Sequence, residues 1–210
     1  MKQAALLDQL RLQIADKRVL EAMRDVPRER FVPAALAAEA WDNVPLPIGW
    51  GQTISQPLVV ARMCELLKLR GSERVLDVGT GSGYHAAVLA RLAAHVWSIE
   101  RHPALSEQAA RNLAAAGVEN VTLVVGDGAR GLPESAPFDA INVAAAATGD
   151  VPHALEEQLA LGGRLVIPRE EGDQRLVVLH RTERGVERMG LERVRFVPLV
   201  SEPARGEGSA

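Results

Sequence analysis

The 210-residue chain has little cysteine, no long apolar run and no excess of basic charge. Its one cysteine, Cys64, cannot form an internal disulfide, which suits a reducing compartment, so we expect a cytoplasmic protein. No apolar run approaches the length of a membrane span, and the N-terminus alternates charge with leucine, unlike a signal peptide. The formal net charge of −3 lacks the basic footprint that nucleic-acid binding leaves. We therefore expect neither a membrane nor a nucleic acid as partner.

Two kinds of catalytic site are also disfavoured. The five histidines are scattered along the chain and no His pair shares a helix face, so we expect no metal site. No Gly-x-Ser-x-Gly elbow stands between a strand and a helix, which argues against a serine hydrolase.

Hydrophobic residues make up 47% of the chain, and its length allows one domain with a full core. We expect that domain at residues 1–200, followed by a loose polar tail at 201–210.

A glycine-rich stretch in the first half of the chain is the strongest local signal. Residues 74–78 read as a buried strand that contains Asp77 near its end, and residues 84–92 read as a helix. Between them lie glycines at alternate positions, Gly79, Gly81 and Gly83. In the dinucleotide fingerprint the third glycine comes three residues after the second, whereas here it comes two residues after. This spacing resembles the S-adenosylmethionine loop of class I methyltransferases, although the loop alone leaves a ligand-free turn open.

The order of the other elements predicts an α/β fold. Helices are expected at residues 4–14, 17–26, 58–69, 84–92, 103–116 and 152–161. Strands are expected at residues 74–78, 95–100, 121–125, 138–143 and 164–167. Alternating β and α units indicate a doubly wound, mainly parallel sheet that is covered on both faces, with N-terminal helices in addition. Two last strands, at 175–180 and 194–200, lie so close together that an antiparallel pair is more typical.

Residues 41–57 form a long, irregular segment that is rich in apolar residues. They include three prolines and two glycines, and no periodicity lasts long enough for a helix. A long, apolar, irregular segment inside a compact domain is usually functional. This segment and residues 195–199 are both apolar enough to be ordered, and both contain proline, which prevents continuous pairing within a sheet. We expect a shallow cleft between them that binds an extended chain through its backbone.

Acidic residues stand at the ends of three expected strands, namely Asp77, Glu100 and Asp127. Open α/β sheets bind ligands at these ends, so we expect the three carboxylates to meet the glycine loop in one pocket. Glu100 comes 17 residues after Gly83, near the spacing at which nucleoside-binding folds place an acceptor for the ribose hydroxyls. Asp127 is placed to accept from an adenine amino group. One such acid is more typical of a helix cap, but three in register favour a nucleoside cofactor.

Further motifs make a family resemblance specific. They lie at Val26–Pro33, Leu46–Pro57, Asp77–Tyr84, Gly126–Gly128, Pro137–Ile141 and Arg195–Leu199. Together they resemble bacterial protein-L-isoaspartate O-methyltransferase over about residues 6–200. The resemblance implies a class I methyltransferase fold with an antiparallel terminal hairpin. It also implies an enzyme that transfers the methyl group of S-adenosyl-L-methionine (SAM) to the free carboxylate of L-isoaspartyl residues in damaged proteins and peptides, and releases S-adenosyl-L-homocysteine.

The same resemblance implies the site residues. Ser55 would be the active-site serine, within an N-terminal segment, residues 1–57, of helices and active-site residues. The cofactor would be bound by Thr53, Ile54, Ser55, Asp77, Gly79, Gly81, Gly83, Glu100, Asp127 and Gly128. Without the resemblance, a serine in this turn is more typical of a backbone hydrogen bond. An isoaspartyl α-carboxylate has a pKa of about 3.5 and is already ionised at neutral pH. Ser55 is therefore expected to orient the carboxylate and not to act as a nucleophile.

Three features depart from the family pattern, namely Leu58, His85 and the loop at 144–151. The family usually has tyrosine and glutamine at the first two positions and a shorter, proline-containing loop at the third. These departures leave the preferred substrate open, including whether D-aspartyl residues are accepted. One alternative is a related carboxyl methyltransferase dedicated to a single peptide. Another is a SAM-binding regulatory module without catalysis, against which the intact Ser55 and glycine loop argue. We expect a monomer.

Overall fold

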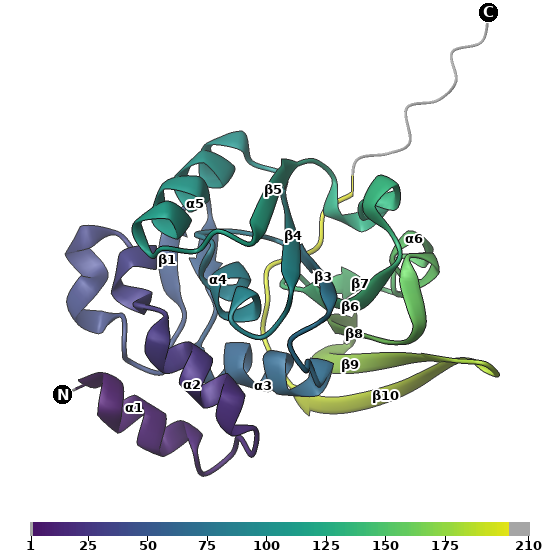
Figure 1. Ribbon diagram of the computed structural model, residues 1–210, viewed down its shortest axis with the longest axis horizontal. Coiled ribbons are helices and arrows are strands. Elements are labelled where there is room, and N and C mark those ends of the chain that lie inside the picture. The colour runs from purple at the N-terminus through teal and green to yellow at the C-terminus, as the bar shows by residue number, and fades with distance from the viewer. Residues whose placement is uncertain (1, 202–210) are drawn as a thin grey trace, which may run out of the picture.

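An eight-stranded sheet forms the centre of the computed structural model, which describes residues 2–201 (Figure 1). The strand order is β10-β9-β8-β6-β3-β4-β5, and β7 pairs with β8. The strands are β3 (Arg74–Val78), β4 (His95–Glu100), β5 (Val121–Val125), β6 (Phe138–Val143), β7 (Ala147–Thr148), β8 (Leu159–Glu171), β9 (Asp173–Thr182) and β10 (Gly185–Arg193). Pairs from β8 to β5 are parallel, whereas β9 and β10 pair antiparallel. This confirms the expected α/β sheet with an antiparallel terminal pair.

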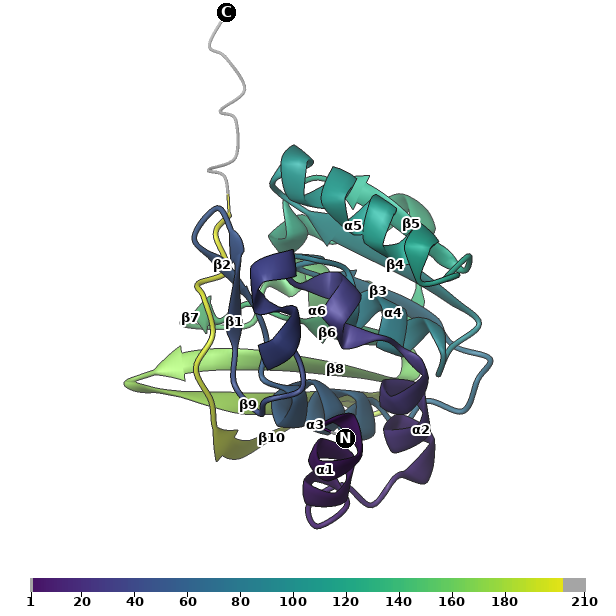
Figure 2. The same cartoon turned by 90° about the vertical axis from the view of Figure 1, so that its left-hand side faces the viewer.

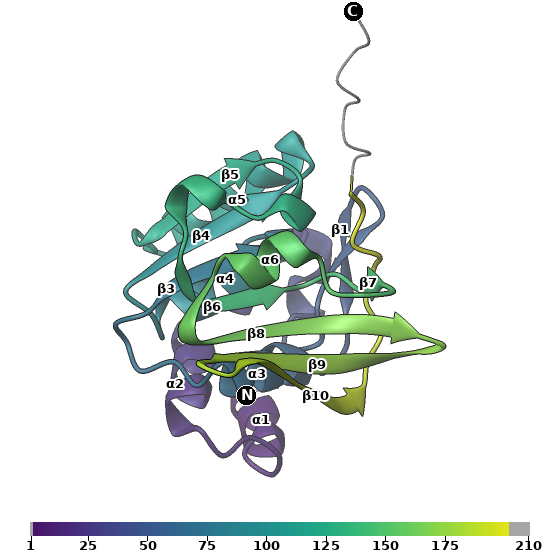
Figure 3. The same cartoon turned by 90° about the vertical axis from the view of Figure 1, so that its right-hand side faces the viewer.

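The strands alternate their side chains between two apolar layers. In β3, Val75 belongs to the apolar cluster beneath the first five helices, while Leu76 and Val78 belong to the cluster on the opposite face. The first face carries α1 (Lys2–Leu10), α2 (Lys17–Asp25), α3 (Pro57–Leu67), α4 (Tyr84–Ala90) and α5 (Pro103–Ala115) (Figure 2). The opposite face carries α6 (His153–Glu157) and the short helices η3 (Gly128–Arg130) and η4 (Pro133–Ser135) (Figure 3). Helices therefore cover both faces of the sheet, and the first face carries more and longer helices than the second. No helix within residues 2–201 has the length and apolarity needed to cross a membrane.

Short-range signals account for where several helices begin. The Asp16 carboxylate accepts a hydrogen bond from Arg18 N at 2.9 Å and caps α2. The helices α3 and α5 begin at Pro57 and Pro103, where the missing N–H leaves no donor unpaired.

Buried Arg28 joins the N-terminal segment to the start of α4. It lies in η1 (Arg28–Phe31), which precedes η2 (Ala34–Glu39), and its Nε donates to Ala40 O at 2.7 Å. Its Cζ lies 4.8 Å from the centroid of the Tyr84 ring. Burial lowers the pKa of this guanidinium, and the contact with the ring offsets part of the cost of burying its charge. Because Tyr84 is the first residue of α4, the N-terminal layer is fixed to the end of the glycine loop.

The irregular segment at 41–57 contains a small hairpin that stands apart from the main sheet. Its strands, β1 (Leu46–Gly49) and β2 (Gln52–Ile54), pair antiparallel. The Asn43 side chain accepts from Leu58 N at 3.0 Å and holds the start of α3 beside the base of the hairpin. The absence of helical periodicity in this segment is therefore explained by a turn and two short strands.

The helix expected at 152–161 is shorter than predicted, because β8 begins within that range. Gly162 and Gly163 lie inside β8 and do not end a helix. A Cβ on Gly163 would lie 2.8 Å from Ala160 O and 2.9 Å from Asp139 O. The two glycines instead permit an irregularity in the β6–β8 ladder. In the sequence alone, a glycine pair that permits a bulge in a strand looks the same as a glycine pair that ends a helix.

The expectation of a strand at 194–200 is wrong. The partner of β9 is β10, which lies in the charged stretch between the two expected strands. Residues 194–200 leave the sheet and make an isolated bridge between Pro198 and Ala146. Most of β10 is exposed and four of its nine residues are charged, as befits an edge strand, so its hydropathy gives no strand signal. Apart from Ser201, the expected tail at 201–210 lies outside the described residues.

Candidate active site

A cleft opens at the carboxyl ends of β3 and β4, where an open α/β sheet binds its ligands. Its walls are the β1–β2 hairpin with Ser55, the glycine loop after β3, and residues 197–200. Figure 2 shows the C-terminal segment running beside the hairpin. The lining includes seven of the ten expected cofactor residues, Thr53, Ile54, Ser55, Gly79, Gly81, Glu100 and Gly128. The predicted juxtaposition of the Ser55 segment and the C-terminal segment is confirmed.

The glycine loop is fixed by backbone hydrogen bonds to the neighbouring strand. Gly79 N and Thr80 N both donate to Ile99 O, at 2.9 and 3.2 Å. Gly81 has a φ of +54°, and a Cβ there would lie 3.1 Å from Ile48 Cδ1. A larger residue would press against β1, so glycine lets the loop approach the hairpin. The two walls of the cleft are therefore held close together.

Glu100 is the strand-end acid that the fold brings into the cleft. Its side chain is nearly buried, with the residue 5% exposed. Glu100 Oε2 accepts from Gly81 N at 2.9 Å, and Oε1 accepts from His102 N at 3.0 Å. The carboxylate thus ties the end of β4 to the glycine loop. Each oxygen keeps a further lone pair, so the group can still accept hydrogen bonds from ligand hydroxyls.

Three expected cofactor residues are absent from the lining, namely Asp77, Gly83 and Asp127. Gly83 faces α5, because a Cβ there would lie 3.3 Å from Ala109 Cβ. The Asp127 carboxylate accepts from Ala129 N at 2.9 Å and from Ser201 Oγ at 3.1 Å. Of the three strand-end acids, Glu100 lines the cleft and Asp77 and Asp127 do not, because a position near a strand end does not fix the direction of a side chain.

Asp77 lies beneath the glycine loop in a buried polar network. It pairs in register with Ser98 and Asn142 on the flanking strands, so the three side chains share one face. The carboxylate accepts from Ser98 Oγ and from Asn142 Nδ2, each at 2.7 Å. Ser98 Oγ in turn lies 2.6 Å from Thr80 Oγ1, in the loop. Burial raises the pKa of Asp77 to about 6, with the charge of Glu100 adding to the rise. Asp77 therefore fixes the loop from below.

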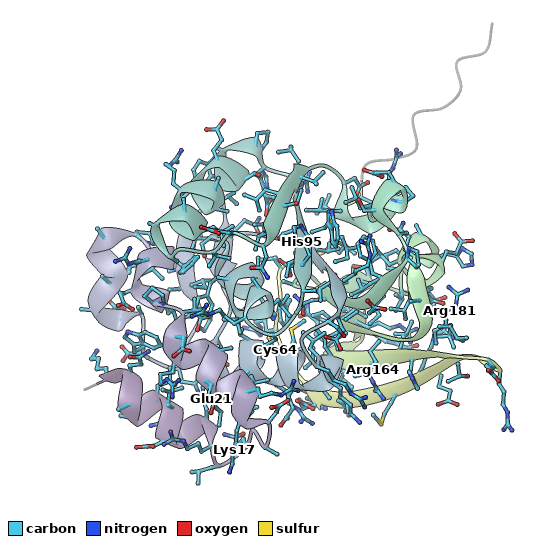
Figure 4. All side chains as sticks on the ribbon, in the orientation of Figure 1. Lys17, Glu21, Cys64, His95, Arg164 and Arg181 are labelled. Carbon is cyan, nitrogen blue, oxygen red and sulfur yellow. The ribbon has the colours of Figure 1, made fainter. Side chains whose placement is uncertain are left out.

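His85 extends this network to α3. Its Nδ1 lies 3.3 Å from Asn142 Nδ2, and its Nε2 lies 3.5 Å from Cys64 Sγ. Burial lowers the pKa of His85 to about 3, so the ring is neutral at neutral pH. Because the Asn142 amide donates to Nδ1, the ring proton is assigned to Nε2, which faces the thiol. Cys64 lies in the interior (Figure 4), and burial raises the pKa of its thiol above the usual range. The thiol is therefore unreactive.

Ser55 follows β2 directly and lines the cleft opposite the glycine loop. Within residues 2–201 its hydroxyl makes no hydrogen bond to another protein group. The local backbone bond that such a serine often makes is thus not formed here. The hydroxyl is available to a ligand in the cleft.

Comparison with known proteins identifies the family. The profile of the protein-L-isoaspartate(D-aspartate) O-methyltransferase (PCMT) family matches residues 1–204. The chain belongs to this family. It is 56% identical over 192 residues to protein-L-isoaspartate O-methyltransferase 2 of Marinobacter nauticus, covering 90% of this chain and 87% of the relative. It is also 56% identical over 201 residues to the Methylorubrum populi protein-L-isoaspartate O-methyltransferase, covering 94% and 91%.

Solved PCMT structures share the fold. One protein-L-isoaspartate O-methyltransferase superposes with a TM-score of 0.85 at 29% identity, covering 96% of this chain and 66% of the solved chain. A beta-aspartate methyltransferase (PCMT) from Plasmodium falciparum in complex with S-adenosyl-L-homocysteine superposes with a TM-score of 0.81 at 28% identity, covering 94% and 98%. The chain is a SAM-dependent methyltransferase that acts on the carboxylate of isoaspartyl residues.

The residues of this cleft fit the PCMT cofactor. Gly79 and Gly81 remove side chains from one wall, and Glu100 supplies a carboxylate that can accept from ribose hydroxyls. A Cβ on Gly128 would lie 2.4 Å from Val78 Cγ1, so this part of the lining also requires glycine. The described residues hold no cluster of three or more His, Cys, Asp or Glu that could bind a metal ion.

Two parts of the lining were not among the expected cofactor residues, although the first lies in the loop at 144–151 that departs from the family pattern. Ala144 and Ala145 follow β6, and Arg101 and His102 follow β4. Both pairs directly follow the carboxyl end of an expected strand, which was the available signal. Neither pair belongs to a recognisable sequence motif. Only their position after a strand in the fold identifies them as lining residues.

Proposed function

We propose that Ser55 orients the substrate carboxylate for methyl transfer. The observation that carries this proposal is the position of the Ser55 hydroxyl, which lines the same cleft as Gly81 and Glu100. A hydroxyl without another partner can donate to one carboxylate oxygen and leave the other oxygen free to attack. Over-strong donors would hold the attacking lone pair, so a single hydroxyl is a suitable compromise. Alignment of reacting groups can supply about 7–11 kcal/mol in well-oriented systems.

We propose that SAM binds on the side of the cleft that contains Glu100 and the glycine loop. Bound SAM supplies an electrophilic methyl group carried on a sulfonium. Glu100 accepts from its hydroxyl groups, and Thr53, Ile54, Gly79, Gly81 and Gly128 form the surrounding wall. Asp77 and Gly83 act from behind the loop, the first through Ser98 and the second through packing against α5. Asp127 fixes the backbone after Gly128 through Ala129 N.

No general base is needed at this site. The isoaspartyl α-carboxylate is ionised at neutral pH, because its pKa is about 3.5. His85 lines the cleft, but its proton-bearing Nε2 faces Cys64. The residues around the substrate therefore hold and orient it and need not remove a proton from it.

We also propose that the enzyme acts as a monomer in the cytoplasm on many damaged proteins and peptides. A single, buried Cys64 supports a reducing compartment. The monomer is tested by light scattering during size-exclusion chromatography at micromolar concentration. A stable dimer mass would contradict this part of the proposal.

Methylation of paired peptides tests the function. Each pair has the same sequence and differs only in a normal aspartyl or an isoaspartyl linkage, and several unrelated sequences are used. The repair enzyme methylates every isoaspartyl member and none of the aspartyl members. Activity on one sequence alone would indicate a dedicated peptide methyltransferase. SAM binding without any transfer would indicate a regulatory module.

A further inference from the structure

The β1–β2 hairpin carries a tryptophan where its turn disfavours one. Gly49 pairs with Gln52, so Trp50 and Gly51 form a two-residue turn, and their φ angles are +50° and +71°. Two-residue turns with positive φ at both positions favour Asn-Gly or Asp-Gly. A non-glycine side chain in this conformation costs about 1–2 kcal/mol. The geometry of the turn therefore gives no reason for tryptophan at this position.

Packing gives no reason either. Trp50 is 54% exposed, and Cβ atoms added to Gly49 or Gly51 would meet no atom within 4 Å. The tip of the hairpin thus stands clear of the surrounding residues. Strained residues that persist without a packing role are typical of functional sites.

The tip lies at the mouth of the cleft. Gly51 and Gln52 line the cleft directly after Trp50, whereas Trp50 itself is not part of the lining. Val200, which is 45% exposed, lines the same cleft from the C-terminal segment. Figure 2 shows the end of the hairpin beside that segment. Two exposed apolar residues therefore lie at the cleft, Val200 in its lining and Trp50 directly next to it in the chain.

We propose that Trp50, together with Val200, receives an apolar side chain that flanks the isoaspartyl residue in the substrate. The substrate is a polypeptide, so its chain must continue past the cleft on both sides of the reacting residue. Trp50 precedes Ser55 by five positions, which an extended chain spans in at most about 17 Å. The favoured apolar residue therefore lies within about five positions of the isoaspartate. Trp50 sets a preference among damaged sites and does not take part in methyl transfer.

Trp50→Asn tests this inference, because asparagine suits the positive φ of the turn and keeps the hairpin. The substrates are isoaspartyl peptides in which one phenylalanine is moved through each of the five positions on either side of isoaspartate in a glycine and serine background. The wild type should show a KM about 3- to 10-fold lower for its best phenylalanine register than for the peptide without phenylalanine. Trp50→Asn should remove this difference and leave kcat on the peptide without phenylalanine unchanged.

Leu12→Asn is the matched control, because Leu12 is an exposed apolar residue, 85% accessible, outside the cleft lining. It should keep the phenylalanine preference. A preference that survives in Trp50→Asn would overturn the inference, as would equal losses on all peptides. Weaker SAM binding by calorimetry in Trp50→Asn would show that the indole covers the cofactor, which also overturns it. The inference rests on the methyltransferase activity and not on the role of Ser55, and activity on the peptide without phenylalanine separates the two.

Discussion

At the scale of single residues, substitution of Ser55 distinguishes a role in aligning the substrate carboxylate from a role as a covalent nucleophile. Ser55→Ala removes a hydroxyl with no protein partner within the described chain, so neither the fold nor SAM affinity should change. Loss of carboxylate alignment should lower kcat about 10²-fold. Initial rates on an isoaspartyl peptide and calorimetry with SAM check the two expectations. Ser72→Ala, at an exposed serine outside the cleft, is the control. Mass spectrometry that detects a methyl group on Ser55 would sink the orienting role.

Glu100 is the residue on which cofactor affinity should depend. Glu100→Ala removes the acceptor for ligand hydroxyls and also frees Gly81 N and His102 N. SAM binding should weaken by about 1.5–3 kcal/mol, the range for hydrogen bonds to a charged group. Glu100→Gln keeps one acceptor oxygen and should lose less. Calorimetry measures both, and an affinity equal to that of the wild type would remove Glu100 from the site.

The strand-end acids that line the cleft and those that do not differ in a physical way. Glu100 was found because its distance along the chain from the glycine loop reflects one helix and one strand. Asp77 carries the same strand-end signal, yet its side chain points to the buried face, where Ser98 and Asn142 meet it. A one-residue change in position turns a strand side chain to the other face. Residue type and approximate position therefore predict a strand-end acid but not its direction.

At the scale of elements, the parallel strands were predictable and the terminal hairpin was not. Buried strands such as β3 and β6 are nearly continuous apolar runs, which the sequence displays directly. The edge strand β10 is stabilised by pairing with β9, and its residues are mostly exposed, with four of the nine charged. Its strand character comes from its neighbour, so single-chain patterns miss it.

The segment at residues 194–200 offers backbone groups from which we predict how the substrate backbone binds. Ala146 N donates to Val197 O at 2.8 Å, and Leu199 N donates to Ala146 O at 2.7 Å. Because successive residues of an extended strand point their polar groups to opposite sides, the Pro198 carbonyl faces away from Ala146. Proline has no N–H, so this position offers an acceptor alone. We expect a substrate amide to donate to Pro198 O.

Backbone-methylated peptides test that expectation. In an isoaspartyl peptide with glycine neighbours, N-methylation at the one amide that meets Pro198 O should raise KM about 2- to 12-fold, the worth of one hydrogen bond. N-methylation at positions further along the peptide is the control and should have little effect. Glycine neighbours exclude the contribution of Trp50. Equal KM values for all N-methylated peptides would contradict backbone recognition at this segment.

At the scale of the whole molecule, five elements meet in the polar seam below the cleft. Cys64 on α3, Asp77 on β3, His85 on α4, Ser98 on β4 and Asn142 on β6 form one connected set. No spacing rule relates these positions, because the tertiary fold alone brings them together. Two of them titrate in opposite senses, which links the stability of the whole fold to pH.

The pKa of Asp77 is raised to about 6, so its contribution to stability is full below about pH 4 and is lost as pH rises through 6. The pKa of His85 is lowered to about 3, so its contribution is full above about pH 6.5 and is lost as pH falls toward 3. Between about pH 4 and 6 the two contributions oppose each other. The wild type should therefore show little change in its free energy of unfolding from this pair across that range.

His85→Gln should expose the Asp77 contribution. Relative to the wild type, the variant should become more stable by about 3 kcal/mol between pH 6.5 and pH 4, because only the wild type has a buried imidazole that its unfolded chain protonates. Asp77→Asn should show the opposite trend and gain relative stability as pH rises from 4 to 6. Urea unfolding at half-unit steps from pH 4 to 7 measures both. Ser72→Ala, at an exposed residue with no titratable side chain, is the control and should follow the wild type. A difference between His85→Gln and the wild type that stays constant with pH would mean that the histidine is not held neutral by the fold.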